Sequence, residues 1–392
     1  MVEYHYGKAL MEMIPKGVNS ITAAWLLATT GVLAYLTFWM MVSPSLAEKN
    51  NRKELKKKKQ PGHNYPSGET TTTTTTTITP LTDFDYRTIN PIDYRPFKTM
   101  QHVSMGIKKM PKEEWIRIDR GYLDRIEERK RVMQTNPKEV FGSNPIVDPA
   151  IAELYEEIMD LLPRRYPTIF DLRGKTLHNK VTNQSYSVDL AGLTPLTMLR
   201  NLGENVEEDF YIMCPDAENE LRLQGYIACF PGGFLSPSRV GMSMREIHQP
   251  VPGFEARIGK GADRFLVRLE PGVFVGRMNW SLQTDGRDLF RMDGNNFYPE
   301  KDNQLPLKSR AVNLGDCYLR VEHQTLTRLA RSRAVIFCVR SYMTSLQDVR
   351  AEGNGPALAD AIESMPERLG VYKMRPLWSE AIYPYLRQQQ SL

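Results

Sequence analysis

The stretch Val273 to Leu282, V-F-V-G-R-M-N-W-S-L, decides how this chain folds. Its side chains alternate in character, as they do in a β-strand whose two faces meet different surroundings. One face carries Val273, Val275, Arg277, Asn279 and Ser281, and the other carries Phe274, Met278, Trp280 and Leu282. The stretch therefore predicts a strand with one partly polar face and one bulky apolar face.

Working outward, other segments have the same strand-like character: Asp209 to Met213, Leu221 to Phe230, Tyr318 to Leu326 and Ala334 to Tyr342. Helical spacing dominates the preceding third, in a segment that opens at Pro111 and in Tyr122 to Gln134, Pro149 to Leu162 and Pro195 to Leu202. Met242 to His248 and Ala262 to Leu269 predict short helices between the strands. This order of elements indicates an α+β fold with an antiparallel sheet.

An uncharged apolar run, Ile21 to Val42, lies near the N-terminus. At about 1.5 Å per residue it is long enough to cross the roughly 30 Å hydrocarbon core of a bilayer. A basic run from Lys49 to Lys59 follows it, and the positive-inside rule then places the long C-terminal part in the cytosol. A cleaved signal peptide fits poorly, because the apolar run is long and its positive charge comes after it. We expect a single-pass membrane protein, of the endoplasmic reticulum.

The chain divides into four parts: a short segment 1–20, a transmembrane helix 21–42, a basic and Thr-rich flexible linker 43–80, and a folded domain 81–392. The linker ends in low-complexity sequence, including an unbroken Thr70 to Thr77 tract. Because much of the net charge of +5 lies in the basic run, the folded domain shows no sign of nucleic-acid binding. The four cysteines form no C-x-x-C pair, which indicates buried free thiols and a reducing compartment.

The usual signatures of enzyme sites are absent from the sequence. It contains no P-loop, no G-x-G-x-x-G, no H-E-x-x-H, no G-x-S-x-G and no zinc-type spacing of Cys and His. The Pro-Gly-Gly turn at Pro231 is too short to hold a phosphate and is interpreted as a plain turn. Any chemistry must therefore come from less familiar residues.

His248 is the first such residue, in the stretch R-E-I-H-Q-P-V-P-G-F-E from Arg245 to Glu255. It lies at the end of a short helical pattern that Pro250 and Pro252 stop. A histidine in this position can bind a metal or haem iron, or transfer protons. The structural alternative is a histidine that complements the helix dipole at a C-terminus.

The polar face of the strand is the second candidate site. Asn279 could place its amide at a substrate or at an iron-bound oxygen, whereas the structural alternative is a solvent-exposed sheet face. Arginines in the following segment could bind carboxylates in bidentate fashion or be ordinary surface residues: Arg320, Arg328, Arg331 and Arg333. His323 faces with Leu319 and Val321, which favours a core histidine.

A set of short motifs resembles one known family. In order they are R-P-F-K from Arg95, M-G-I-K-K-M from Met105 followed by W-I-R-I-D, L-P-R-R-Y-P from Leu162, E-E-D-F from Glu207, C-F-P from Cys229, I-H-Q-P-V-P-G-F-E, D-R-F from Asp263, N-W-S-L from Asn279, V-E-H-Q-T-L-T-R-L from Val321 and S-R-A-V-I-F-C-V-R-S-Y from Ser332. Together they look like the haem-dependent oxidative N-demethylase α-subunit-like family. The likeness is collinear from Arg95 to Tyr342.

The resemblance implies a PAS-like domain that binds haem b and oxidatively removes a methyl group from a small amine. It implies O₂ as a substrate and electrons from a separate flavin and iron–sulfur reductase. By position, His248 is the expected axial haem ligand, and Asn279 and Trp280 are expected in or beside the pocket. Arg320, Arg328 and Arg340 are the expected contacts of the haem propionates.

This chain departs from the family pattern in two ways. His323 stands where an arginine is expected, which makes it a second candidate ligand. The predicted membrane anchor would be absent from a soluble bacterial-type subunit, so we expect a eukaryotic, fungal member that could accept a larger or more apolar amine. We therefore predict an α+β fold, a PAS-like antiparallel sheet with flanking helices preceded by one transmembrane helix. The predicted function is that of a membrane-anchored haem-dependent monooxygenase; a haem-binding sensor and a non-catalytic scaffold are the alternatives.

Overall fold

The computed structural model of the chain describes residues 78–95, 97, 104–233, 237–297, 309 and 311–388. These residues belong to one of two compact units, Thr75–Leu392. The other unit, Met1–Thr74, lies outside the described residues, as do the predicted transmembrane segment 21–42 and nearly all of the predicted linker.

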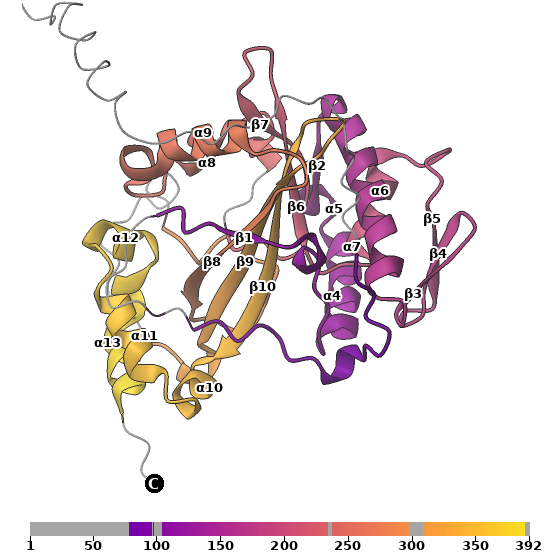
Figure 1. The fold of residues 1–392 in the computed structure, drawn as a ribbon. Helices are drawn as coiled ribbons and strands as arrows, with labels where there is room; N and C mark the ends of the chain where they lie inside the picture. Colours follow the sequence, from indigo (N-terminus) through magenta and orange to yellow (C-terminus); the bar gives the residue numbers. More distant parts are fainter. Residues whose placement is uncertain are drawn as a thin grey trace, which may run out of the picture. The chain divides into compact units, whose positions relative to one another are not determined.

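The unit is built on a large antiparallel sheet (Figure 1). Its seven strands lie in the order β1-β8-β9-β10-β6-β7-β2. Their bounds are β1 Lys108–Met110, β2 Phe141–Ser143, β6 Asp209–Pro215, β7 Leu221–Ile227, β8 Phe274–Gln283, β9 Tyr318–Arg328 and β10 Val335–Ser345. A separate three-stranded sheet has the order β3-β4-β5: Phe170–Arg173, Thr176–Asn179 and Gln184–Ser187.

Helices surround the large sheet. The α-helices are α4 Tyr122–Thr135, α5 Pro137–Val140, α6 Asp148–Arg165, α7 Pro195–Gly203, α8 Met244–His248, α9 Lys260–Arg268, α10 Leu346–Ala351, α11 Gly355–Glu363, α12 Glu367–Tyr372 and α13 Arg375–Arg387. A π-helical turn, η5 Glu255–Gly259, leads directly into α9. Short 3₁₀ turns are η1 Tyr86–Thr88, η2 Lys112–Glu114, η3 Pro145–Val147, η4 Pro237–Arg239 and η6 Leu314–Asp316.

The predicted long strands are present, and the alternation along β8 is confirmed. Phe274, Trp280 and Leu282 are buried on its apolar face, while Arg277 and Asn279 are half-buried on the other. We call the face with Arg277 and Asn279 the site face and the opposite face the core face. The edge strands β1 and β2 escaped prediction, because three residues are too few to show a period of two.

Two predicted helix boundaries were wrong. α6 continues through Pro163 to Arg165, because a proline in the last turn removes only one hydrogen bond. The helix expected from Pro111 is a single 3₁₀ turn. Beyond it, Ile116 and Ile118 are buried on either side of the less buried Arg117, which is a strand-like period.

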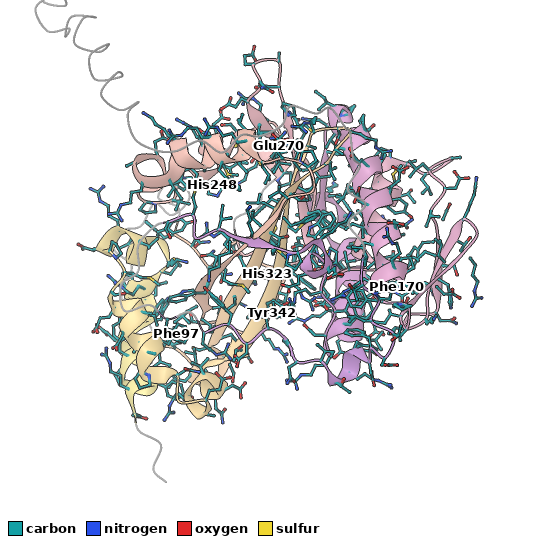
Figure 2. All side chains as sticks on the ribbon, in the orientation of Figure 1. Phe97, Phe170, His248, Glu270, His323 and Tyr342 are labelled. Atoms are coloured by element: carbon teal, nitrogen blue, oxygen red, sulfur yellow. The ribbon has the colours of Figure 1, made fainter. Side chains whose placement is uncertain are left out.

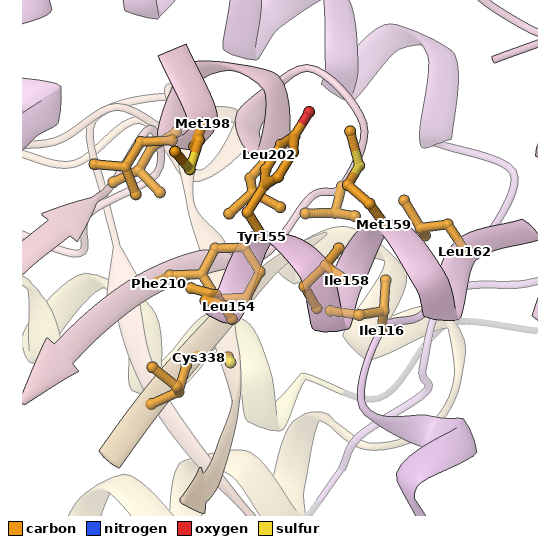
Figure 3. Packing of buried hydrophobic residues seen from close by; sticks show 14 of the residues in the cluster. Ile116, Leu154, Tyr155, Ile158, Met159, Leu162, Met198, Leu202, Phe210 and Cys338 are labelled. Atoms are coloured by element: carbon orange, nitrogen blue, oxygen red, sulfur yellow. The ribbon is translucent and has the colours of Figure 1, made fainter. Parts of the chain in front are cut away.

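On the core face, α4, α6 and α7 pack against one half of the sheet. The apolar side of α6 supplies Leu154, Ile158 and Leu162, each fully buried (Figure 3). They belong to the same cluster as Phe210 on β6 and Cys338 on β10. This burial is the main stabilising contribution of the N-terminal helices.

The C-terminal helices cover the other half of the core face. Trp280, Leu319 and Tyr342 join a cluster with Leu358 of α11 and Ile382 of α13. At one end of the site face, α8 and α9 cover an apolar cluster instead. Met244 and Leu266 contribute from these helices, and the strands supply Met213, Val275, Leu326 and Val335. The middle of the site face carries polar side chains.

The predicted fold class and location need correction. Among the described residues, no helix is long and apolar enough to cross a membrane. In place of the predicted PAS-like sheet behind a transmembrane helix, the structure shows a mixed α/β fold with a large antiparallel sheet, and it gives no support to the predicted single-pass membrane protein. The predicted span 21–42 itself lies outside the described residues.

A buried ionic network joins the sheet to the segment that precedes α4. Arg340 of β10 contacts Asp119 at 2.7 Å, Glu207 at 2.6 Å and Glu208 at 3.7 Å. All four side chains are buried, and burial raises the pKa of Glu207 to about 7 although Arg340 opposes the shift. The guanidinium of Arg340 thus offsets the negative charge of three carboxylates, whose burial in the ionised form would be very unfavourable without it.

Replacing Arg340 by Leu is expected to lower the free energy of unfolding by about 3–5 kcal/mol, because buried carboxylates would lose their cation. Arg164→Ala is the control, since it breaks an exposed pair with Asp160 and is expected to cost less than about 1 kcal/mol. Urea denaturation of the full chain, followed by tryptophan fluorescence, measures both. Equal losses in the two variants would contradict the structural role of the network.

Candidate functional site

The middle of the site face is built by two neighbouring strands. Antiparallel pairing puts Arg277 of β8 opposite Gln324 of β9, and Asn279 opposite Glu322. Directly opposed residues point to the same side of a sheet, so the four side chains form one polar group. All four are only half-buried, whereas the strand ends are buried. The middle of the face is therefore the part that could contact a ligand.

Hydrogen bonds hold the carboxylate of Glu322 in place. Its Oε2 accepts from Gln324 Nε2 at 2.8 Å and from Asn279 Nδ2 at 3.3 Å. Its Oε1 faces the backbone of Gly232, where an added Cβ would lie only 2.6 Å away. The loop that follows β7 can approach the carboxylate this closely because residue 232 is glycine.

Two cations lie near this carboxylate. Burial lowers the pKa of Arg277, and Glu322 and Tyr94 oppose that shift. The buried Nε of Arg277 has no hydrogen-bond partner. Lys373, which follows α12, donates to the carbonyl oxygen of Trp280 at 2.6 Å, and burial lowers its pKa to about 8. The Nε atoms of Arg320 and Arg340 are also without a partner, but the other guanidinium nitrogens of these two residues donate to the protein.

His248 ends α8, whose start is fixed by a capping box between Ser243 and Glu246. Its Nδ1 lies 2.9 Å from the carbonyl oxygen of Met244, and its ring stacks on Phe254 with a centroid distance of 4.5 Å. A carbonyl only accepts, so Nδ1 carries the hydrogen of the neutral ring. Burial lowers the pKa of His248 to about 4, and the nearby Arg277 adds to the shift. The imidazole is neutral at pH 7.

His323 lies on the core face, opposite to the site face. It pairs with Met278 and Arg340, and its Nε2 would lie 3.3 Å from a Cβ at Gly276. Burial lowers its pKa to about 4 as well. Figure 2 shows His248 beside α8 and His323 on the strands. Because the sheet separates the two histidines, they cannot both contact one haem.

The predicted arginines bind internal groups of the protein. Arg320 donates to the carbonyl oxygens of Phe230 and Leu289. Arg328 donates to those of Leu266 and Leu269. The guanidinium of Arg340 is the centre of the ionic network on the core face. The structure thus does not bring these three arginines together around a common space.

The two residues predicted for the pocket separate in the same way. Asn279 belongs to the polar group of the site face. Trp280 is buried on the core face, edge-on to Phe97 at a centroid distance of 6.0 Å. Alternation along the strand already assigned these neighbours to opposite faces, so their joint assignment to one pocket was inconsistent with it.

Sequence reasoning missed two members of this polar group, Glu322 and Gln324, and also Lys373 beside it. Glu322 and Gln324 could have been found by extending the alternation from β8 to its neighbour β9. Lys373 gave no such signal, because it comes from a helix far along the chain. Within the part of the chain that the structure describes, no three His, Cys, Asp or Glu side chains gather as a metal site.

The fold and the site face define the class of protein: it is a mixed α/β protein with a polar group on its sheet and a neutral histidine beside that group. A comparison with protein families then gives a match over residues 106–383 to the model described as haem-dependent oxidative N-demethylase, alpha subunit-like. The match covers more than half of the chain, so the chain belongs to this family. The family's name indicates haem dependence and oxidative N-demethylation.

The residues of the site face fit a haem. A histidine that binds haem iron does so as a neutral imidazole, and its other nitrogen usually donates to a carbonyl or carboxylate, as Nδ1 of His248 does. The acidic side chains of a haem need cations, and Arg277 has a buried donor without a partner. His323, on the core face, has Arg340 as its neighbouring arginine. The guanidinium of Arg340 is already paired with carboxylates, so it is not available to a propionate.

The low pKa of His323 makes stability depend on pH. Above pH 6.5 the ring is neutral in both states; between pH 6.5 and about 4 only the unfolded chain binds the proton, so stability falls as the pH is lowered. Between pH 7 and pH 5 the free energy of unfolding should therefore fall by roughly 2 kcal/mol less in His323→Gln than in the native chain. Urea unfolding at both pH values measures this, with His178→Gln as the control. Identical pH dependence in His323→Gln and the native chain would refute it.

Proposed function

We propose that this chain binds haem b on the site face, with His248 as the axial ligand, and oxidatively removes a methyl group from a small amine. The observation that carries the proposal is the position of His248 beside Arg277. One supplies a neutral imidazole, and the other a guanidinium with an unpartnered buried nitrogen. Membership of the haem-dependent family supports the proposal.

His248 would bind the iron through Nε2. The carbonyl oxygen of Met244 holds the hydrogen on Nδ1 and so fixes the tautomer. Phe254 stacks on the ring and limits its rotation. The low pKa prevents protonation from competing with iron at neutral pH. Backbone, aromatic neighbour and burial together prepare this residue for ligation.

Arg277 and Lys373 would neutralise the propionates. Both lie near Glu322, as does the buried Arg320, so cations outnumber this carboxylate on the face. Such an excess is unfavourable in a partly buried place unless an anion completes it. Among the arginines, Arg277 takes the role that the sequence had assigned to Arg320, Arg328 and Arg340.

Glu322 and Asn279 would position the substrate. A small amine is cationic at neutral pH, and Glu322 offers a carboxylate that Gln324 and Asn279 already hold by hydrogen bonds. When bound, haem supplies O₂-dependent oxidation of the C–H bond next to the nitrogen. Electrons would come from a separate flavin and iron–sulfur reductase. The residues of this chain bind and orient, and they exclude water from the reacting carbon.

The first test is an absorption spectrum of the full chain supplied with haem. A sharp Soret band that shifts on reduction and on CO binding is expected, and His248→Ala should abolish it. His323→Ala should leave the band unchanged, because that ring lies on the opposite face. If only His323→Ala removed the band, the assignment of the ligand would be overturned; no band in the native chain would leave a scaffold role instead.

Activity separates an enzyme from a haem-binding sensor. With haem bound and a ferredoxin-type reductase present, N-methyl amines should yield formaldehyde, and His248→Ala should yield none. A chain that binds haem through His248 and releases no formaldehyde from any small N-methyl amine would be a sensor. The two measurements therefore test the cofactor and the reaction separately.

Arg277→Gln should weaken haem binding about ten- to hundredfold, because an ionic hydrogen bond to a propionate contributes about 1.5–3 kcal/mol. Titration of the chain with haem, followed at the Soret band, gives the dissociation constant. Arg173→Gln is the control, since Arg173 is exposed on the small sheet. An unchanged dissociation constant in Arg277→Gln would exclude Arg277 from the haem site.

A further inference from the structure

A row of cations lies along the helix formed by η5 and α9. Its members are Arg257, Lys260, Arg264 and Arg268, and all four are exposed. Residues four apart in a helix lie on the same side, so the last three form one line, which Arg257 precedes by three residues. We call these four residues the basic stripe.

The acidic residues of the same helix do not compensate this charge. Glu255 and Asp263 bind Arg245 of α8, at 2.9 Å and 2.5 Å. Within the described part of the chain, no carboxylate lies within ion-pair distance of any member of the basic stripe. The acidic side chains of this helix therefore pair with α8, whereas its basic side chains are exposed to solvent.

An apolar side chain lies among these cations. Val267 is 52% exposed, and it follows Lys260 by seven residues and Arg264 by three, so it shares their side of the helix. A single exposed apolar residue is ordinary by itself. Surrounded by uncompensated arginines, however, it gives the apolar centre and charged rim that are typical of protein interfaces.

The basic stripe lies close to the proposed haem ligand. Phe254, which stacks on His248, directly precedes η5, and Arg245 ties α8 to α9. Figure 1 shows α8 and α9 together in one layer beside the strands. The inner side of this layer contains His248, and the outer side presents the stripe. A partner bound there would be separated from the ligand by one layer of helix.

We propose that the basic stripe is the docking surface of an acidic electron-donor protein of the iron–sulfur type. The inference rests on the proposed function, because it assigns the place where the donor meets the haem domain. In the step it serves, one electron leaves the reduced iron–sulfur centre and converts ferric to ferrous haem iron, and no bond forms or breaks. Opposite charges would steer the two proteins together and fix their orientation.

Nucleic acid and anionic lipid are the other partners that cations attract. The apolar Val267 at the centre and the contact of this helix layer with His248 both favour a protein donor.

The test is calorimetric titration of the full chain with an acidic [2Fe–2S] ferredoxin as the probe. Binding is expected at low ionic strength and should weaken at roughly 0.15 M salt, where exposed charges are screened. The variant Arg264→Glu/Arg268→Glu should bind at least about tenfold more weakly. The control Arg120→Glu/Lys138→Glu changes the net charge equally at exposed sites elsewhere and should change binding less than about twofold.

The titration is made with and without haem, so its result does not depend on haem binding. Ferredoxin binding that is lost in the stripe variant supports the docking surface even if the haem spectrum fails, and the proposed function then falls alone. No ferredoxin binding, or equal losses in the two double variants, overturns the inference. It is also overturned if the stripe variant loses binding to a DNA duplex or to phosphatidylserine vesicles but keeps ferredoxin binding.

Discussion

The register of β9 is the constraint on which the rest of the structure depends. β9 pairs along its length with both β8 and β10, so each of its side chains has fixed neighbours on two strands. Glu322 and Gln324 thereby meet Asn279 and Arg277 on one face, while His323 points to the other. A slip by one residue would exchange the faces and bury the polar group in the core. Fold and site are consequences of the same pairing.

Buried arginines have two different roles in this protein, and their partners distinguish them. Arg340 is surrounded by carboxylates and joins β10 to the N-terminal elements, which makes it a structural residue. Arg277 lies half-buried on the other side of the sheet; its Nε, like that of Arg340, has no hydrogen-bond partner, but unlike Arg340 it forms no ion pair with a described carboxylate. The same side chain therefore stabilises the fold in one place and is suited to bind an anion in the other. Residue type alone carries no information about this difference.

The layer of α8 and α9 connects the proposed chemistry with the proposed partner. Its inner side holds His248 through a backbone carbonyl and Phe254. Arg245 forms ion pairs with Glu255 of η5 and Asp263 of α9, so the cations on the outer side remain uncompensated. The proposed electron donor needs a route to the proposed ligand. Placing the donor surface over the ligand would give that route without disturbing the substrate side of the sheet.

The sequence by itself determined the long strands, the helices α4 and α6 to α9, and the two faces of β8 with Trp280 on the apolar one, because period-2 and helical spacing are local properties. It also singled out His248 and Asn279 and favoured a core position for His323. Only the tertiary structure showed the C-terminal helices α10 to α13, which arginines bind internal groups, and that Lys373 reaches the polar group. These outcomes depend on contacts between distant segments.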